Sequence, residues 1–256
     1  MSVITYACLA GIGTIEMNGP PANTYGIAFM RELNVAIQEA IDDPACKVVI
    51  VRSALPGFFC GGADIKEFKA NTASANREMI ALAHDTLNKL SQSEKVFIAE
   101  VGGHALGGGL EIALSCDFRF AANGDYRIGL PEVSLGLLPG NGGTQRLTSL
   151  VGISKALELM VTGARLSPKS AYELGILNRL YEASELGEQT HSFARDLSQG
   201  ATLAIGKIKR SVYDGQFLEP GLAQERRNIG TLFASNDARE GFTAFVERRK
   251  PKFSGN

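Results

Sequence analysis

A unit of buried strand, glycine-rich loop and helix occurs twice in this chain, and few folds accommodate it. KVVIVRS (47–53) and VFIAEV (96–101) are short apolar runs with many β-branched residues, as is typical of buried strands. Each run leads through a glycine cluster, CGGAD (60–64) or LGGG (106–109), into a segment with helical spacing. The pattern favours an α/β fold in which crossover connections join parallel strands. The GxGxxG motif of a dinucleotide-binding fold does not follow either strand.

The rest of the chain divides into a core and a helical end. Residues 3–17 alternate around two glycines and predict a β-hairpin, and apolar residues at four-residue spacing predict a helix over 25–42. After residue 143 the pattern becomes helical. We therefore expect a core over 1–196 and a helical region over 197–256. A helical end of about 60 residues buries little surface by itself, so this region should pack on the core or on another subunit.

Composition argues against several kinds of protein. With 26 basic and 27 acidic residues, the net charge is -1, so the chain lacks the positive field that holds nucleic acid. No apolar run approaches the ~18 residues of a membrane span, and the N-terminal stretch lacks the charged start of a signal peptide. The four cysteines match no metal-binding or redox spacing. We expect a cytoplasmic protein that binds no metal, membrane or nucleic acid.

The two glycine clusters suggest an anion-binding site. Glycine lets a ligand approach backbone N–H groups closely, and the first turn of a helix leaves such groups without intrahelical partners. Two N–H groups, one from each cluster, can converge on one oxygen and form an oxyanion hole. The alternative is that these glycines only allow close packing of strand and helix.

Two glutamates complete this pattern. Glu111 lies just after the second glycine cluster, and Glu132 follows Pro131. Either carboxylate alone is explained by the dipole at a helix start, which contributes ~0.3–1 kcal/mol. Both occur in apolar segments, however, and two carboxylates in one poorly hydrated pocket acquire different pKa values. They are therefore candidates for acid/base catalysis, whereas no serine, cysteine or histidine lies in a nucleophile motif.

Four segments together resemble the crotonase, or enoyl-CoA hydratase, superfamily. FFCGGADIKEF and HALGGGLEIALSCDFRFA resemble its two oxyanion loops, the second with the first catalytic glutamate, and LPEVSLGLLPGNGGTQRL resembles the segment with the second. SNDAREGFTAFVERRKPKF resembles the C-terminal trimerisation helix. The resemblance runs from end to end. It implies a crotonase-like α/β spiral of ββα units with a C-terminal helical trimerisation region, assembled as a homotrimer or as a hexamer of two trimers.

The resemblance also implies roles for individual residues. The N–H groups of Ala63 and Gly108 would hold the thioester oxygen of an acyl-CoA substrate, with Glu111 and Glu132 as the catalytic glutamates. Further positions would bind the acyl group or CoA: Gly62, Asp64, Ile65, Lys66, Gly140 and, in contact with a neighbouring subunit's CoA, Phe245 and Arg248. For Arg248 a solvated helix end is the alternative. No separate cofactor is implied, because CoA is part of the substrate.

A chain that keeps both glutamates has the hydratase arrangement. The implied reaction adds water across a 2-enoyl-CoA and gives a 3-hydroxyacyl-CoA through a thioester enolate. Glu132 would protonate the α-carbon and Glu111 would orient or deprotonate the water. We expect Phe58, Phe59 and residues 70–90 to border the acyl pocket.

Other members of the superfamily provide the alternatives. A Δ3-Δ2-enoyl-CoA isomerase typically keeps only the position of Glu132, and other acyl-CoA lyases of the family differ in their acid/base set. An RNA-binding hydratase homologue would carry a lysine-rich early helix, but GIAFMRELNVAIQEAIDD (26–43) has no lysine.

Overall fold

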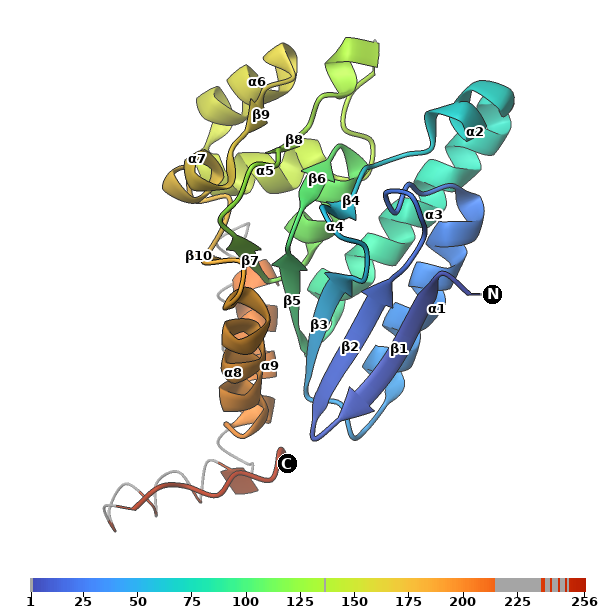
Figure 1. Cartoon of the computed structure of the whole chain (residues 1–256). Coiled ribbons are helices and arrows are strands. Elements are labelled where there is room, and N and C mark those ends of the chain that lie inside the picture. Colours follow the sequence, from blue (N-terminus) through green and yellow to red (C-terminus); the bar gives the residue numbers. More distant parts are fainter. Residues whose placement is uncertain are drawn as a thin grey trace.

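The computed structural model describes residues 2–135, 137–214, 236, 237, 240, 244, 247 and 249–256. Two sheets form the centre of the molecule (Figure 1). The larger has the order β1-β2-β3-β5-β7-β10, comprising Ile4–Leu9, Ile12–Met17, Val48–Ser53, Val96–Val101, Phe118–Ala122 and Arg179–Tyr181. The smaller has the order β4-β6-β8-β9, comprising Phe58–Cys60, His104–Leu106, Ile128–Gly129 and Arg165–Leu166.

Successive strand pairs wind as a spiral through both sheets. β3, β5 and β7 lie parallel in the larger sheet, and the strand after each of them, β4, β6 or β8, lies parallel in the smaller one. Helices complete each turn: α2 (Ile65–Ala70) and α3 (Ala73–Gln92) after β4, α4 (Gly108–Ser115) after β6, and the short 3-10 helix η1 (Glu132–Leu135) and α5 (Gly143–Val151) after β8. The predicted α/β spiral of ββα units is therefore confirmed.

Two features differ from the sequence prediction. The glycine clusters do not follow the long strands directly, because β4 and β6 come between them. The region after residue 143 is not wholly helical either, since it adds β9 to the smaller sheet and β10 to the edge of the larger one. These strands have two or three residues each, which is too short to show an alternating pattern.

Helices cover both faces of the larger sheet. The predicted hairpin is β1 and β2, and the predicted early helix is α1 (Ile27–Asp42), which packs against α3. Tyr6 of β1 donates its hydroxyl to Asp43 at the end of α1, whereas Thr5 and Ala7 face His191 of α8 (Leu186–Ser198). α8 therefore packs on the face opposite α1 and α3 (Figure 1).

The remaining helices extend the fold around the smaller sheet and toward the C-terminus. α6 (Ile153–Thr162) follows α5, and α7 (Pro168–Glu173) follows β9. Ser167 is its N-cap, and its hydroxyl accepts the Ser170 N–H. α9 is Thr202–Asp214.

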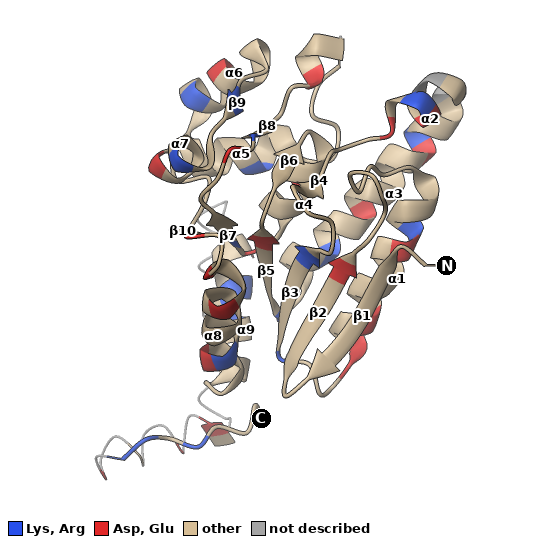
Figure 2. Ribbon diagram, viewed as in Figure 1, with Lys and Arg blue, Asp and Glu red and all other residues tan. Residues whose placement is uncertain are grey.

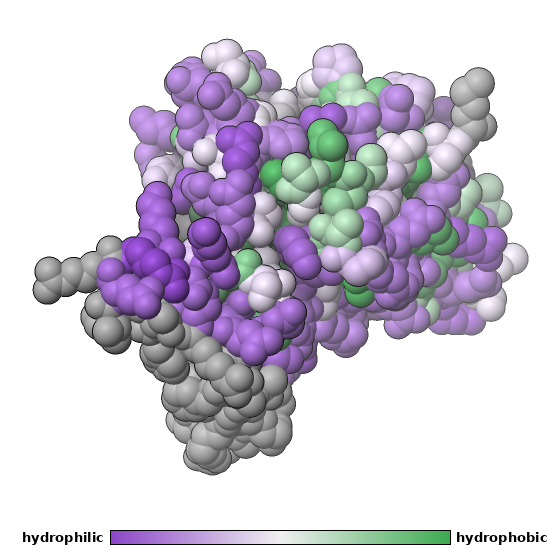
Figure 3. Space-filling view, turned by 90° about the horizontal axis from the view of Figure 1, so that it is seen from below, coloured by the Kyte–Doolittle hydropathy of each residue, from purple (hydrophilic) through white to green (hydrophobic). Residues whose placement is uncertain are grey.

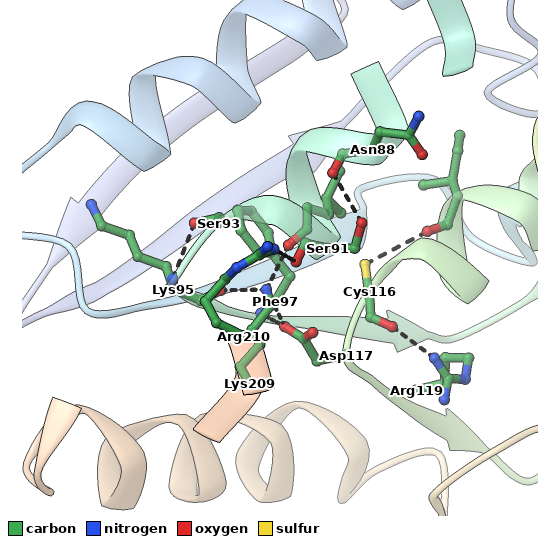
Figure 4. A network of polar contacts seen from close by, with 12 residues as sticks. Asn88, Ser91, Ser93, Lys95, Phe97, Cys116, Asp117, Arg119, Lys209 and Arg210 are labelled. Carbon is green, nitrogen blue, oxygen red and sulfur yellow. Dashed lines mark hydrogen bonds and ion pairs between the residues drawn. The ribbon is translucent and has the colours of Figure 1, made fainter. Parts of the chain in front are cut away.

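A buried ion pair fastens α9 to the core (Figure 4). Lys209 Nζ lies 2.9 Å from Asp117 Oδ2 and also donates to the carbonyls of Leu90 and Lys95. Asp117 in turn accepts the N–H of Phe97 in β5 at 2.7 Å. α9, near the start of the predicted helical region 197–256, thus packs on the core. The predicted boundary between residues 196 and 197 falls inside α8 and stays a prediction, since much of 197–256 lies outside the described residues.

The surface carries both signs of charge and scattered apolar side chains. Basic and acidic residues are distributed over most of the helices (Figure 2). Seen from below, the described residues are mainly hydrophilic, with a hydrophobic area near the centre of the view and smaller ones toward its right-hand side (Figure 3). Ile208 and Val212 of α9 remain exposed. In the part of the chain that the structure describes, no helix is long and apolar enough to cross a membrane.

Candidate active site

Both glycine clusters and both glutamates border one cavity. Its volume is about 550 Å³ and it lies beside the carboxyl ends of β4 and β6. Because these strands are parallel neighbours, the loops that follow them meet at one edge of the smaller sheet. The lining is mainly apolar, with Ile65, Phe68, Ile80, Leu106, Pro131, Leu135, Leu137 and Leu138.

The two predicted oxyanion donors come from these loops. Within the described residues, neither the Ala63 N–H nor the Gly108 N–H has a hydrogen-bond acceptor, and both residues line the cavity. Gly62 has a φ of +95°, and a Cβ there would lie 2.6 Å from the Leu106 carbonyl oxygen and 3.6 Å from the Gly108 nitrogen. Glycine is therefore required for the two loops to approach closely enough for their free N–H groups to share one oxygen.

Glu111 is almost fully buried, with 1% of its surface exposed. Its Oε1 accepts the N–H groups of Asn141 and Gly143, both at 2.7 Å, from the start of α5. Burial raises the pKa of Glu111, while these two N–H groups and the charge of Arg146 act in the opposite direction. The carboxylate is thus held by partners that stabilise its ionised form.

Glu132 has a different environment. A Cβ at Gly107 would lie 3.0 Å from Glu132 Oε1, so this carboxyl group lies over the start of α4. Its Oε2 is buried with no hydrogen-bond partner among the described residues. Burial raises the pKa of Glu132 to about 7, and the charge of Glu111 contributes to the rise. The two carboxyl groups can therefore hold different protonation states at neutral pH.

The structure brings most of the predicted site residues together. Gly62, Ala63, Ile65, Gly108, Glu111, Glu132 and Gly140 line the cavity. Asp64 does not: its side chain caps α2 by accepting the N–H groups of Lys66 and Glu67. Lys66 does not line the cavity either, and Phe245 and Arg248 lie outside the described residues.

The predicted border of the acyl pocket is partly wrong. Phe59 is fully buried in the core, and the ring of Phe58 packs on His104 at 5.0 Å between centroids, so neither reaches the cavity. Both belong to β4 rather than to a loop, so their side chains point to opposite faces of the strand, Phe59 into the core and Phe58 toward His104. Ile80 of α3, from the predicted region 70–90, does line it.

Sequence reasoning missed several residues of the site. Tyr25 and Asn141 line the cavity, and Arg146 donates to the carbonyl oxygen of Asn141 at 2.7 Å. The predicted helix over 25–42 included Tyr25, but this residue lies in the loop before α1, and no motif marks it as part of a site. Elsewhere in the described ranges, no group of three or more His, Cys, Asp or Glu residues is placed to hold a metal ion.

Comparison with known proteins places the chain in a family. The model of the enoyl-CoA hydratase/isomerase family matches residues 8–256. The chain belongs to this family. Two relatives are a probable enoyl-CoA hydratase of Bacillus subtilis, 33% identical over all of both chains, and the enoyl-CoA isomerase/hydratase fer4 of Mycosarcoma maydis, 39% identical over 96% of this chain and 94% of the relative.

A solved structure agrees with this assignment. The enoyl-CoA hydratase of Geobacillus kaustophilus is 40% identical, with a TM-score of 0.97 over 100% of this chain and 98% of that one. The suspected superfamily and its fold are thereby confirmed.

Proposed function

We propose that this protein is an enoyl-CoA hydratase, which adds water across the double bond of a 2-enoyl-CoA. The observation that carries the proposal is the pair of glutamates in one apolar cavity. Two N–H groups hold Glu111, and Glu132 Oε2 has no hydrogen-bond partner among the described residues. Hydration needs one group that accepts a proton and one that donates it. Two carboxyl groups with different environments supply both.

In the proposed reaction the thioester oxygen accepts the N–H groups of Ala63 and Gly108. The oxygen of a water molecule bonds to C3. The electrons of the double bond then move toward the thioester oxygen and form the enolate. Each donor of such a hole contributes ~2.7–4 kcal/mol to the transition state. Glu111 takes the proton from the water, and the protonated Glu132 gives its proton to C2. Proton exchange with solvent then restores both glutamates.

The remaining site residues fit this reaction as further proposals. Gly140 would shape the water site, and the apolar end of the cavity near Ile80 would hold the acyl chain. Lys66, beside the first loop, would contact the CoA, with Gly62, Asp64 and Ile65 shaping that loop. Phe245 and Arg248 would reach CoA on a neighbouring subunit. No separate cofactor is proposed.

The direct test is a hydration assay. We expect crotonyl-CoA and at least some longer 2-enoyl-CoAs to lose the absorbance of the conjugated thioester when the protein is added. Steady-state rates over a chain-length series would show which acyl chain the cavity accepts. Absence of turnover at every chain length would contradict the proposed function.

An isomerase is the second candidate, because one relative is named an isomerase as well as a hydratase. An isomerase would convert a 3-enoyl-CoA into its 2-enoyl isomer, whose conjugated absorbance would rise. If the absorbance rises and does not fall again, the 2-enoyl-CoA is not hydrated, and hydration is excluded as the main activity.

We also propose a homotrimer, or a hexamer of two trimers, that acts in the cytoplasm in fatty acid β-oxidation. The exposed apolar side chains of Ile208 and Val212 on α9 support an assembly, since a partner subunit would cover them. The described cysteines are all free thiols, which fits a reducing compartment. We expect light scattering coupled to gel filtration to give a trimeric or hexameric mass, and a monomer at micromolar concentration would refute the assembly.

A further inference from the structure

Tyr25 contacts three parts of the site that come from distant segments of the chain. Its main chain holds the first glycine loop. The Tyr25 N–H donates to the Gly62 carbonyl oxygen, and the Asp64 N–H donates to the Tyr25 carbonyl oxygen, both at 2.9 Å. These bonds lie on either side of Ala63, as in a parallel β-bridge. The Ala63 N–H is left unpaired by this arrangement, while its position is fixed from both sides.

The side chain of Tyr25 reaches the second glycine loop. A Cβ at Gly108 would lie 1.9 Å from Tyr25 Oη and 2.5 Å from Cζ, so the phenol occupies the space that any larger residue would need. Tyr25 is 3% exposed, so its ring is packed against this loop and almost fully shielded from solvent. The ring therefore sets how closely the start of α4, with its Gly108 N–H, approaches the first loop.

The hydroxyl of Tyr25 extends these contacts to Glu111. Asn141 Nδ2 donates to Tyr25 Oη at 2.5 Å, and the Asn141 N–H donates to Glu111 Oε1 at 2.7 Å. Among the described residues, Asn141 Oδ1 is buried without a hydrogen-bond partner. The hydrogen bond from Nδ2 to Tyr25 Oη is therefore what fixes the Asn141 side chain. One residue thus connects both oxyanion donors with the segment that orients Glu111.

We propose that Tyr25 is a positioning residue for hydration, which holds the oxyanion hole and Glu111 at a fixed separation through Gly108 and Asn141. This inference rests on the proposed hydratase activity. The water on Glu111 must meet C3 while the thioester oxygen occupies the hole, so the distance between these two points decides whether a bound substrate reacts. A displacement of about 1 Å can cost ~10²-fold in rate.

The test compares Tyr25→Phe, Asn141→Ala and the double variant with the wild-type protein. Tyr25→Phe keeps the ring against Gly108 and removes only the acceptor of Asn141. We expect each single variant to lower kcat by ~10–10²-fold with KM nearly unchanged, since the groups that bind substrate remain. The double variant should be no slower than the slower single variant, because both changes break the same connection.

A pH profile separates positioning from a general loss of structure. The charged and titratable groups around Glu111 are Glu132 from η1, Arg146 from α5 and Tyr25 itself. Burial keeps the Tyr25 hydroxyl protonated by raising its pKa well above the usual range, so Tyr25→Phe removes no charge. The Asn141 N–H lowers the pKa of Glu111. If that bond loosens, the pKa of Glu111 rises and the acidic limb of kcat/KM moves to higher pH.

Tyr126→Phe is the matched control. Tyr126 is also a buried tyrosine with a hydrogen-bonded hydroxyl, which donates to backbone carbonyls at Val101 and Ala122, outside the cavity. It should keep the wild-type kcat and pH profile. If the wild-type protein hydrates enoyl-CoA and Tyr25→Phe has the same kcat and pH profile, the inference about Tyr25 is wrong but the proposed function stands. Additive effects of the two changes in the double variant would have the same consequence. A wild-type protein without hydratase activity would instead refute the proposed function.

Discussion

Replacement of either Glu111 or Glu132 by Gln is expected to lower kcat for hydration by ~10²–10⁴-fold, the usual contribution of a general acid or base. Glutamine keeps the size of the side chain and removes the titratable proton. In Glu111→Gln the Oε1 atom can still accept the N–H groups of Asn141 and Gly143, so the loop before α5 should stay in place. The loss would then come from the missing base rather than from a changed fold.

The two variants should also differ in their dependence on pH. The pKa of Glu132 is raised to about 7, and a general acid acts only while it holds its proton. In the wild-type protein, kcat/KM should therefore fall as pH rises above about 7. It should also fall at low pH, where Glu111 becomes protonated. We expect Glu132→Gln to lose the alkaline limb and Glu111→Gln to lose the acidic one in whatever activity remains.

Glu158→Gln serves as the control for this pair, because Glu158 is exposed on α6, outside the cavity, and pairs with Lys155. Steady-state kinetics with crotonyl-CoA decide the outcome. Near-full activity in either active-site variant would show that its glutamate is not catalytic. A loss confined to Glu132→Gln would favour the isomerase, which needs a single acid/base group.

The sequence was most informative where local pattern and packing agree. The runs 47–53 and 96–101 became β3 and β5, since continuous β-branched stretches suit strands buried on both faces. The glycine clusters also indicated close approach of two loops, which the space around Gly62 bears out. In both cases a few adjacent residues are sufficient to predict the local structure.

Other parts of the site depend on contacts between distant segments. Tyr25 and Asn141 are 116 positions apart, and nothing near either residue indicates that their side chains meet. Phe58 and Phe59 were expected at the acyl pocket because the three-residue strand β4 has no detectable period. Asp64 has the local role of a helix N-cap, which a motif shared with a family does not reveal.

The second large effect concerns stability. Lys209→Met is expected to lower the free energy of unfolding by ~3–5 kcal/mol, because it leaves the carboxylate of Asp117 buried without its counter-charge. Only 5% of the Lys209 side chain and 9% of the Asp117 side chain are exposed, so water cannot replace the missing partner. Lys209 also donates to the backbone carbonyls of Leu90 and Lys95, which would lose these hydrogen bonds. Urea unfolding at one fixed protein concentration measures the change.

Two further variants show whether the buried charge is the cause. Lys155→Met removes a lysine from the more exposed pair with Glu158, and a surface pair of this kind contributes ~0–1 kcal/mol. Adding Asp117→Asn to Lys209→Met removes the orphaned charge and keeps an oxygen for the Phe97 N–H, so it should recover part of the lost stability. If Lys209→Met cost no more than Lys155→Met, the ion pair would not be what fastens α9 to β5. The attachment would then have to come from apolar packing of α9 against α3 and β5.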